Sequence, residues 1–251
     1  MTRLPDSFLR GHIAHRGLHD RTNGRPENSV AAFMAALDLG IAIELDVQPS
    51  ADGVAMAFHD NNLDRLTLEV GPIHLRTAAD LSQIPLRGGP AGIPALGDVL
   101  TLIGGRVPLL IEIKDRDGDM GANIGPLEDA VLAALDGYAG DVACMSFNPN
   151  SVAHLAARAP RIPRGLVTSA FLPEHWPELT ESTRHRLAGI PDVERVGASF
   201  ISHEVGTLDM PRVAEIKAAG LPILCWTVRS AAQEREARKI ADAVTFEGYL
   251  P

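Results

Sequence analysis

Short apolar segments bounded by glycine, proline and aspartate recur along the chain and predict nine β-strands. These segments are residues 13–14, 42–47, 54–58, 109–113, 142–147, 165–167, 197–201, 223–228 and 243–246. Most are separated by stretches such as Ser29–Leu39 and Pro211–Ala219, whose apolar residues recur with the spacing of an amphipathic helix. Strands that alternate with helices predict βαβ units and a parallel sheet.

One link between predicted strands is too short for a helix. Only residues 48–53 separate segment 42–47 from segment 54–58, and they contain the turn dipeptide Asp52-Gly53. A parallel connection needs a crossover of roughly a dozen residues, whereas a short link of this kind forms a hairpin. We therefore expect 54–58 to run antiparallel to 42–47, which brings His59 level with Glu44 to Asp46 within about one residue.

The other eight strands predict an α/β fold, a (β/α)8 barrel of TIM type with a β-hairpin after its second strand. Such barrels are typically about 250 residues long, so the 251 residues predict a single barrel domain over 1–251. An open doubly wound sheet is the alternative. Against it, the first strand ends in Ala14-His15-Arg16-Gly17 and not in a Gly-x-Gly-x-x-Gly motif.

The composition argues against two kinds of partner, nucleic acids and membranes. The formal net charge of −9 disfavours a nucleic-acid surface, because such surfaces neutralise phosphates with Lys and Arg. No apolar run approaches the roughly 20 residues of a membrane span, and the first residues lack the apolar stretch of a signal peptide. We expect a cytoplasmic protein without stable membrane insertion, and the sequence does not indicate its oligomeric state.

The two cysteines, Cys144 and Cys225, both lie in predicted strands. We expect them to be small residues of the core.

Charged and imidazole side chains gather near the ends of the early predicted strands. They are His15, Arg16, Glu44, Asp46, His59, Asp60, Glu112 and Lys114. Such groups are costly to bury unpaired, but in a barrel the carboxyl ends of all strands converge on one pocket where they find partners. We expect these residues to form one site.

Three carboxylates in this set indicate a metal site. Glu44 and Asp46 are two residues apart, so on a strand they point to the same face, where they repel unless a cation lies between them. Glu112 completes an all-oxygen set that suits one Mg²⁺ or Ca²⁺ ion, or Mn²⁺, better than zinc. The alternative is that Glu44 and Asp46 form ion pairs with Arg16 and Lys114.

Two further pairs of residues suit chemistry on an anionic substrate. His15 and His59 are candidates for proton transfer, because imidazole alone has an unperturbed pKa near neutrality. Arg16 and Lys114 on the same rim suit a phosphate ester.

The segment Pro26-Glu27-Asn28-Ser29 precedes a predicted helix. Asn28 and Ser29 are both candidates for its N-cap. Glu27 is a candidate for a residue that lies next to the metal ligands without binding the metal itself.

Taken in order, these motifs resemble the glycerophosphodiester phosphodiesterase family. The matching segments are Ala14-His15-Arg16-Gly17, Pro26-Glu27-Asn28-Ser29, Ile43-Glu44-Leu45-Asp46-Val47, Asp52-Gly53, Phe58-His59-Asp60, Leu63-Asp64-Arg65, Ile93-Pro94-Ala95-Leu96, Ile111-Glu112-Ile113-Lys114, Ser146-Phe147 and Trp226-Thr227-Val228. The resemblance therefore covers nearly the whole chain.

The resemblance implies a (β/α)8 barrel that uses a divalent ion to hydrolyse small-molecule glycerophosphodiesters to glycerol 3-phosphate and an alcohol. It assigns roles by position: Glu44, Asp46 and Glu112 to the metal, Arg16 and Lys114 to the phosphoryl oxygens, His15 as general base and His59 as general acid. Phe147 and Trp226 lie at strand ends, where they either line the substrate pocket or belong to the core.

The last strand departs from the family pattern. Family members often end it in Thr-Asp followed shortly by Pro, whereas this chain has Thr245-Phe246-Glu247-Gly248-Tyr249, so the role of Glu247 is open. Residues 63–94 form a short segment, which predicts no large cap domain and an open site that accepts varied head groups.

Two other functions fit part of the pattern. A related barrel phosphodiesterase acts on lysophospholipids, with or without release of a cyclic phosphate, but it needs an apolar groove or membrane-binding loop, and only 4% of residues are aromatic. A non-catalytic barrel that binds a phosphorylated ligand has no need for two histidines and three carboxylates together.

Overall fold

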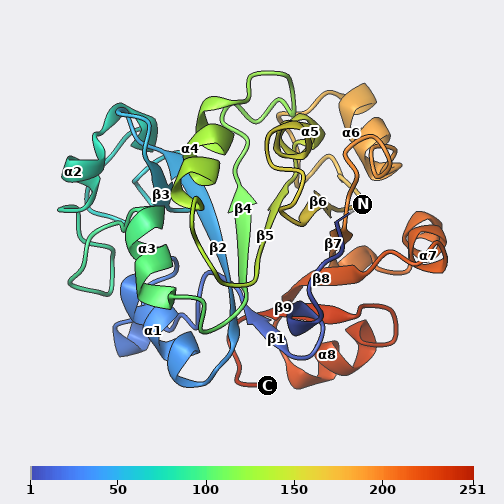
Figure 1. Ribbon diagram of the computed structural model, residues 1–251, viewed down its shortest axis with the longest axis horizontal. Helices are drawn as coiled ribbons and strands as arrows, with labels where there is room; N and C mark the ends of the chain where they lie inside the picture. Colours follow the sequence, from blue (N-terminus) through green and yellow to red (C-terminus); the bar gives the residue numbers. More distant parts are fainter. Residues whose placement is uncertain (1) are drawn as a thin grey trace.

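The computed structural model describes residues 2–251 and shows a closed parallel barrel surrounded by helices (Figure 1). The strands are β1 (His12–Ala14), β2 (Ala42–Pro49), β3 (Ala55–Ala57), β4 (Leu109–Ile113), β5 (Val142–Ser146), β6 (Arg164–Thr168), β7 (Phe200–Glu204), β8 (Ile223–Val228) and β9 (Ala243–Phe246). Their order is β1-β9-β8-β7-β6-β5-β4-β2, and a further pairing of β1 with β2 closes the ring. The predicted barrel is therefore confirmed, and the open doubly wound sheet was the wrong alternative.

The remaining strand, β3, forms the predicted hairpin with β2. The two run antiparallel, with Val47 opposite Ala57. Gly53 has a φ of 80°, a left-handed conformation that glycine adopts readily in tight turns. Continued by two residues, this register places His59 opposite Leu45, as the equal arms of the hairpin predicted.

One predicted strand is displaced along the chain. The apolar pattern predicted a strand over 197–201, but β7 spans Phe200–Glu204. Gly197 has a φ of 58° and belongs to the preceding turn, so the extended backbone begins only after it.

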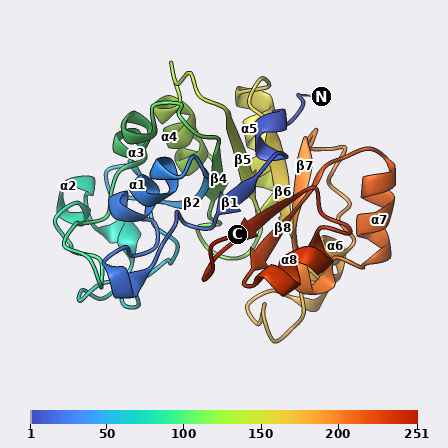
Figure 2. The same cartoon turned by 90° about the horizontal axis from the view of Figure 1, so that it is seen from below.

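The helices surround the barrel, and all but the short α2 belong to its outer ring, as Figure 2 shows from below. They are α1 (Val30–Asp38), α2 (Ala78–Leu81), α3 (Leu96–Ile103), α4 (Pro126–Ala134), α5 (Pro149–Arg158), α6 (Glu181–Ala188), α7 (Pro211–Ala218) and α8 (Ala231–Ala237). Short 3-10 turns are η1 (Asp6–Phe8), η2 (Arg21–Asn23), η3 (Ile73–Leu75) and η4 (Val205–Thr207). Within residues 2–251, no helix has the length and apolar character needed to cross a bilayer.

Alternation along the strands sends one set of side chains outward and the other into the barrel. On β4, Leu109 and Ile111 belong to the core between the sheet and the helices, whereas Leu110 belongs to a second core inside the barrel. Because successive side chains on a strand point to opposite faces, Glu112 points inward like Leu110, one step nearer the carboxyl end. Cys144 and Cys225 are buried free thiols, as predicted for core residues.

Residues 63–94 form a small lobe beside the hairpin. The segment contains only α2 and η3 as regular helical structure, and its buried apolar residues share a compact cluster with Met56 and Phe58. This lobe holds the backbone that follows β3, and with it His59, against the barrel.

Candidate functional site

Three buried carboxylates meet inside the barrel near its carboxyl end. One oxygen from each of Glu44, Asp46 and Glu112 lies within 4.8 Å of the others. The pairing of β2 with β4 sets Asp46 directly beside Glu112, and Glu44 precedes Asp46 by one inward position. The structure thus brings together the three carboxylates that the sequence proposed as metal ligands.

The crowding of these carboxylates changes their pKa values. Burial, together with the charges of Asp46 and Glu112, raises the pKa of Glu44 well above its ordinary value. Burial also opposes ionisation of Asp46, but Lys114 and His59 are among the cations that hold its pKa well below the ordinary value. Three crowded carboxyl oxygens are a donor set that could hold a hard divalent cation such as Mg²⁺ or Ca²⁺.

Two backbone segments before α1 fix the carboxylates in place. The side-chain amide of Asn28 donates to Asp46 Oδ2 over 2.9 Å, and the Asp46 backbone N–H donates to Asn28 Oδ1 over 3.2 Å. The backbone N–H of Arg16 donates to Glu44 Oε2 over 2.8 Å. Of the two N-cap candidates, Ser29 caps the helix, because its Oγ accepts from the Ala32 N–H. The role of Asn28 beside Asp46 was missed from the sequence.

The two predicted cations line the same cluster. Lys114 Nζ donates to Glu112 Oε1 over 2.7 Å and lies 3.4 Å from Asp46 Oδ1. Arg16 Nη1 donates to Glu27 Oε1 over 2.6 Å, and Arg16 Nε lies 3.3 Å from Asp46 Oδ2. Asp46 therefore forms the ion pairs with Arg16 and Lys114 that the sequence left as an alternative, whereas within residues 2–251 Glu44 contacts Arg16 only through its backbone N–H. Glu27 reaches Arg16 and lies outside the three-carboxylate cluster.

His15 follows β1 and contacts a carboxylate from the far end of the chain. Its Nδ1 lies 2.6 Å from Glu247 Oε2, just after β9. Burial outweighs this contact and lowers the pKa of His15, which keeps the imidazole neutral near pH 7. The hydrogen bond with His15 is the main cause that holds the pKa of Glu247 well below its ordinary value. Glu247 is thus a site residue that the sequence left without a role.

His59 follows β3 and is held in a similar way. Its Nδ1 lies 2.6 Å from Asp60 Oδ1. Arg65 donates through Nε to Asp60 Oδ2 over 2.7 Å and through Nη1 to Glu27 Oε2 over 2.8 Å. Asp60 and Arg65 received no role from the sequence, although both lie in segments that carried the family resemblance.

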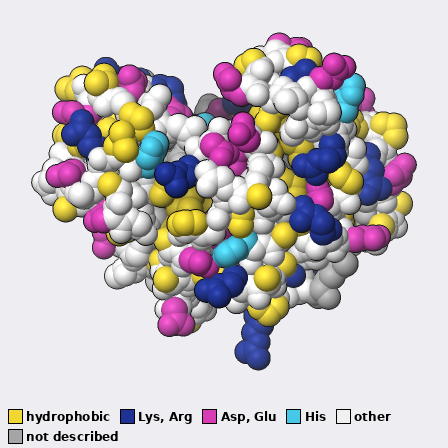
Figure 3. Space-filling view, turned by 90° about the horizontal axis from the view of Figure 1, so that it is seen from above, with side chains coloured by type: hydrophobic (Ala, Val, Ile, Leu, Met, Phe, Trp, Pro, Cys, Tyr) yellow, Lys and Arg dark blue, Asp and Glu magenta, His cyan; other side chains and the backbone are white. Residues whose placement is uncertain are grey.

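A cavity of about 450 Å³ opens beside the acidic cluster. Its lining residues are Gln48, His59, Asp60, Asn61, Glu112, Lys114, Asp115, Gly118, Met120, Phe147, Trp176 and Trp226. Figure 3 views the molecule from this end of the barrel and shows acidic side chains near the middle of the face.

Both aromatic residues singled out from the sequence, Phe147 and Trp226, lie at the cavity wall. Their ring centroids are 5.5 Å apart, and the planes are nearly perpendicular at 86°. The indole N–H of Trp226 donates to the Ser202 backbone oxygen over 3.0 Å, which fixes the ring. Trp176, the other tryptophan of the chain, also lines the cavity and was missed.

Comparison with known proteins agrees with this arrangement. The model of the glycerophosphoryl diester phosphodiesterase family matches residues 15–246. A glycerophosphodiester phosphodiesterase of Caldanaerobacter subterraneus subsp. tengcongensis is 36% identical over 174 residues, which are 65% of this chain and 69% of that protein. The Bacillus subtilis protein YhdW is 28% identical over 227 residues, which are 87% of this chain and 86% of that protein.

A solved structure is similar over nearly the full length. An Oleispira antarctica phosphodiesterase in complex with the product sn-glycerol-3-phosphate aligns with a TM-score of 0.78 at 27% identity, covering 96% of this chain and 94% of that one. The fold, the strand-end motifs and the match over residues 15–246 agree. The chain therefore belongs to the glycerophosphoryl diester phosphodiesterase family.

Proposed function

We propose that this chain hydrolyses glycerophosphodiesters to glycerol 3-phosphate and an alcohol with the help of a divalent cation. The observation that carries this proposal is the meeting of three carboxylates, two cations and two carboxylate-bound histidines at one end of the barrel. Family membership supports the reaction class. The similar Oleispira antarctica phosphodiesterase, whose product is sn-glycerol-3-phosphate, supports the product.

The charged residues would bind the ion and the phosphoryl group. Glu44, Asp46 and Glu112 would hold the divalent cation, which supplies positive charge that stabilises the phosphoryl oxygens as their charge develops. Arg16 and Lys114 lie against the same carboxylates and would bind the phosphoryl oxygens directly. Arg16 Nε supports this role, because it is buried and makes no hydrogen bond within residues 2–251.

His15 would act as the general base. With a proton on Nδ1 that is donated to Glu247, the neutral imidazole keeps a lone pair on Nε2. The lowered pKa of His15 favours this neutral form at pH 7. Nε2 would then take the proton of the attacking hydroxyl group.

His59 would act as the general acid. Asp60 binds its Nδ1 and is itself fixed by Arg65, so the ring is oriented, while its Nε2 has no hydrogen-bond partner within residues 2–251 and can donate to the substrate. The position of His59 on the cavity wall suits proton transfer to the departing alkoxide.

Phosphorus NMR of glycerophosphocholine incubated with the protein tests this proposal. With Mg²⁺, Ca²⁺ or Mn²⁺, the diester signal should give way to that of glycerol 3-phosphate, and EDTA should stop the conversion. Turnover of a lysophospholipid without turnover of glycerophosphocholine would favour the lysophospholipid enzyme instead. Binding of glycerol 3-phosphate without turnover of any diester would favour a non-catalytic phosphate binder.

A further inference from the structure

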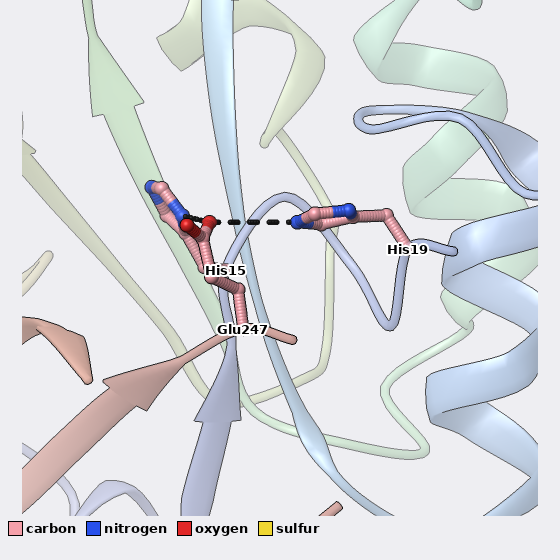
Figure 4. Close-up of side chains that lie close together, drawn as sticks. All are labelled: His15, His19 and Glu247. Atoms are coloured by element: carbon pink, nitrogen blue, oxygen red, sulfur yellow. Dashed lines mark hydrogen bonds and ion pairs between the residues drawn. The ribbon is translucent and has the colours of Figure 1, made fainter. Parts of the chain in front are cut away.

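A second group of metal-binding side chains lies beside the proposed general base. His15, His19 and Glu247 offer one ligand atom each, and these atoms lie within 4.8 Å of one another (Figure 4). The three residues come from the end of β1, the loop after it and the end of β9. Two imidazole nitrogens and one carboxylate oxygen form a donor set that differs from the all-oxygen cluster.

Both imidazoles converge on the same oxygen of Glu247. Oε2 lies 2.6 Å from His15 Nδ1 and 3.5 Å from His19 Nε2. The other oxygen, Oε1, accepts from Arg229 Nε over 2.8 Å and is therefore turned away from the imidazoles. Figure 4 shows the two rings approaching the carboxylate from different sides. The three donor atoms are therefore close enough together for one ion to contact all of them.

His19 Nε2 is the unusual member of the group. The atom is buried and has no hydrogen-bond partner within residues 2–251, although it faces a carboxylate. Buried polar atoms of native proteins are nearly always partnered, so an orphaned imidazole nitrogen calls for an explanation. A metal ion between the two imidazoles and the carboxylate would satisfy it.

We propose that His15, His19 and Glu247 bind a borderline transition-metal ion such as Zn²⁺, and that this ion inhibits the enzyme. Two histidines and one glutamate are a ligand set that zinc adopts, with a fourth position for water. A cavity of about 740 Å³, which both His19 and Glu247 line, lies beside the group. The inhibitory part of this inference rests on the proposed function of His15.

The ligand separations fit such an ion after a small adjustment. Tetrahedral zinc with bonds of about 2.0–2.1 Å holds its ligand atoms roughly 3.3 Å apart. The separation of His19 from Glu247 is already 3.5 Å, and that of His15 from Glu247 has to widen from 2.6 Å by less than about 1 Å.

The ion inhibits the enzyme because it binds Nδ1 of His15. In the active tautomer Nδ1 carries the proton and Nε2 carries the lone pair. An ion at Nδ1 displaces that proton, and the neutral ring then carries its proton on Nε2. Nε2 has no lone pair left to accept the proton of the attacking hydroxyl, so the general base is lost until the ion leaves.

Titration of buffered Zn²⁺ into the Mg²⁺-supported hydrolysis of glycerophosphocholine tests the proposal. The Zn²⁺ concentration for half-inhibition should rise at least tenfold in His19→Gln, whose rate without zinc should match the wild type. His154→Gln is the matched control, because His154 is exposed to a similar degree and contacts one carboxylate, Asp129, over 2.8 Å. It should keep the wild-type sensitivity to zinc.

A binding measurement separates this proposal from the proposed function. In excess Mg²⁺, competition with a chromophoric zinc chelator should show one tight Zn²⁺ per chain, which is lost in His19→Gln and retained in His154→Gln. This result is expected whether or not glycerophosphocholine turns over. Equal zinc binding by wild type and His19→Gln, or equal inhibition of both, would overturn the proposal.

Discussion

His15 and Glu247 are in hydrogen-bond contact although 232 positions separate them in the chain. They meet because β1 and β9 are neighbours in the closed ring, with Ala14 beside Phe246. His15 follows Ala14 and Glu247 follows Phe246, so these two residues lie at the same level of the barrel. Closure of the barrel thus completes the surroundings of the proposed general base.

Glu247→Gln should lower kcat by about tenfold to hundredfold with little change in KM, because the amide keeps the side chain's size but loses its charge next to Nδ1. Glu247 raises the pKa of His15, so its loss should also shift the acidic limb of the kcat/KM profile to lower pH. Steady-state kinetics from pH 5 to 9 measure both effects. An unchanged pH profile with a lower kcat would show that Glu247 is only structural.

Asn28→Gly should weaken the response to the divalent ion. Asn28 has a φ of 52°, so glycine keeps the backbone conformation while it removes both hydrogen bonds to Asp46. Loss of such a supporting contact typically costs about tenfold to hundredfold in metal affinity. The Mg²⁺ concentration for half-maximal activity should rise by that factor.

Ser29→Ala is the matched control for Asn28→Gly. Ser29 caps α1 and makes no contact with the acidic cluster among its described hydrogen bonds. Its loss should lower the free energy of unfolding by about 1 kcal/mol without changing the Mg²⁺ requirement. If both variants raised the Mg²⁺ requirement equally, a general loosening of this segment would be the better explanation.

His203 should make the folded state sensitive to acid. It is buried between Thr168 and Thr207, and burial lowers its pKa from 6.5 to about 4. Between these two pKa values the unfolded chain binds a proton that the folded chain excludes. The free energy of unfolding therefore falls as the pH drops from about 6.5 to about 4. Below about pH 4 both states bind the proton, so His203 causes no further loss.

The size of this effect follows from the pKa shift. The lowering corresponds to roughly 3 kcal/mol of stability lost over that pH range. Urea unfolding of the wild type and His203→Asn at pH 7 and pH 4.5 measures it. The variant should lose less stability between the two pH values, and an equal loss would contradict the prediction.

Head-group preference should be broad. Residues 63–94 form a small lobe with only α2 and η3, and the cavity beside the acidic cluster is open to solvent at this end of the barrel. Rates for glycerophosphocholine, glycerophosphoethanolamine and glycerophosphoglycerol should lie within about tenfold of one another. Selectivity for one of them by a hundredfold or more would point to a specific pocket for the alcohol.

Much of the fold followed from local signals. Alternation of apolar strands and helices predicted the barrel, and the short link around Gly53 predicted the β2–β3 hairpin. The two-residue spacing of Glu44 and Asp46 predicted that they share a face, because side-chain direction on a strand depends on the backbone alone. The boundary of β7 was wrong by three residues, since an apolar segment does not show where a turn ends.

Contacts between residues that only the folded chain brings together were harder to predict from the sequence. The sequence gives no local sign that Glu247 faces His15, because their contact exists only after the last strand closes the ring. Asn28 resembled an N-cap because asparagine is common there, and only its left-handed backbone turns the amide towards Asp46.

The most direct test of the account measures glycerol 3-phosphate release from glycerophosphocholine against Mg²⁺ concentration for wild type, Glu44→Gln and His154→Gln. Glu44 lies in the three-carboxylate cluster, whereas His154 lies on α5 outside it. The account predicts saturable activation by Mg²⁺ in wild type and in His154→Gln, and a rate at least a hundredfold lower at every Mg²⁺ concentration in Glu44→Gln. Full activity of the wild type in EDTA, or a Glu44→Gln variant that responds to Mg²⁺ as the wild type does, would contradict it.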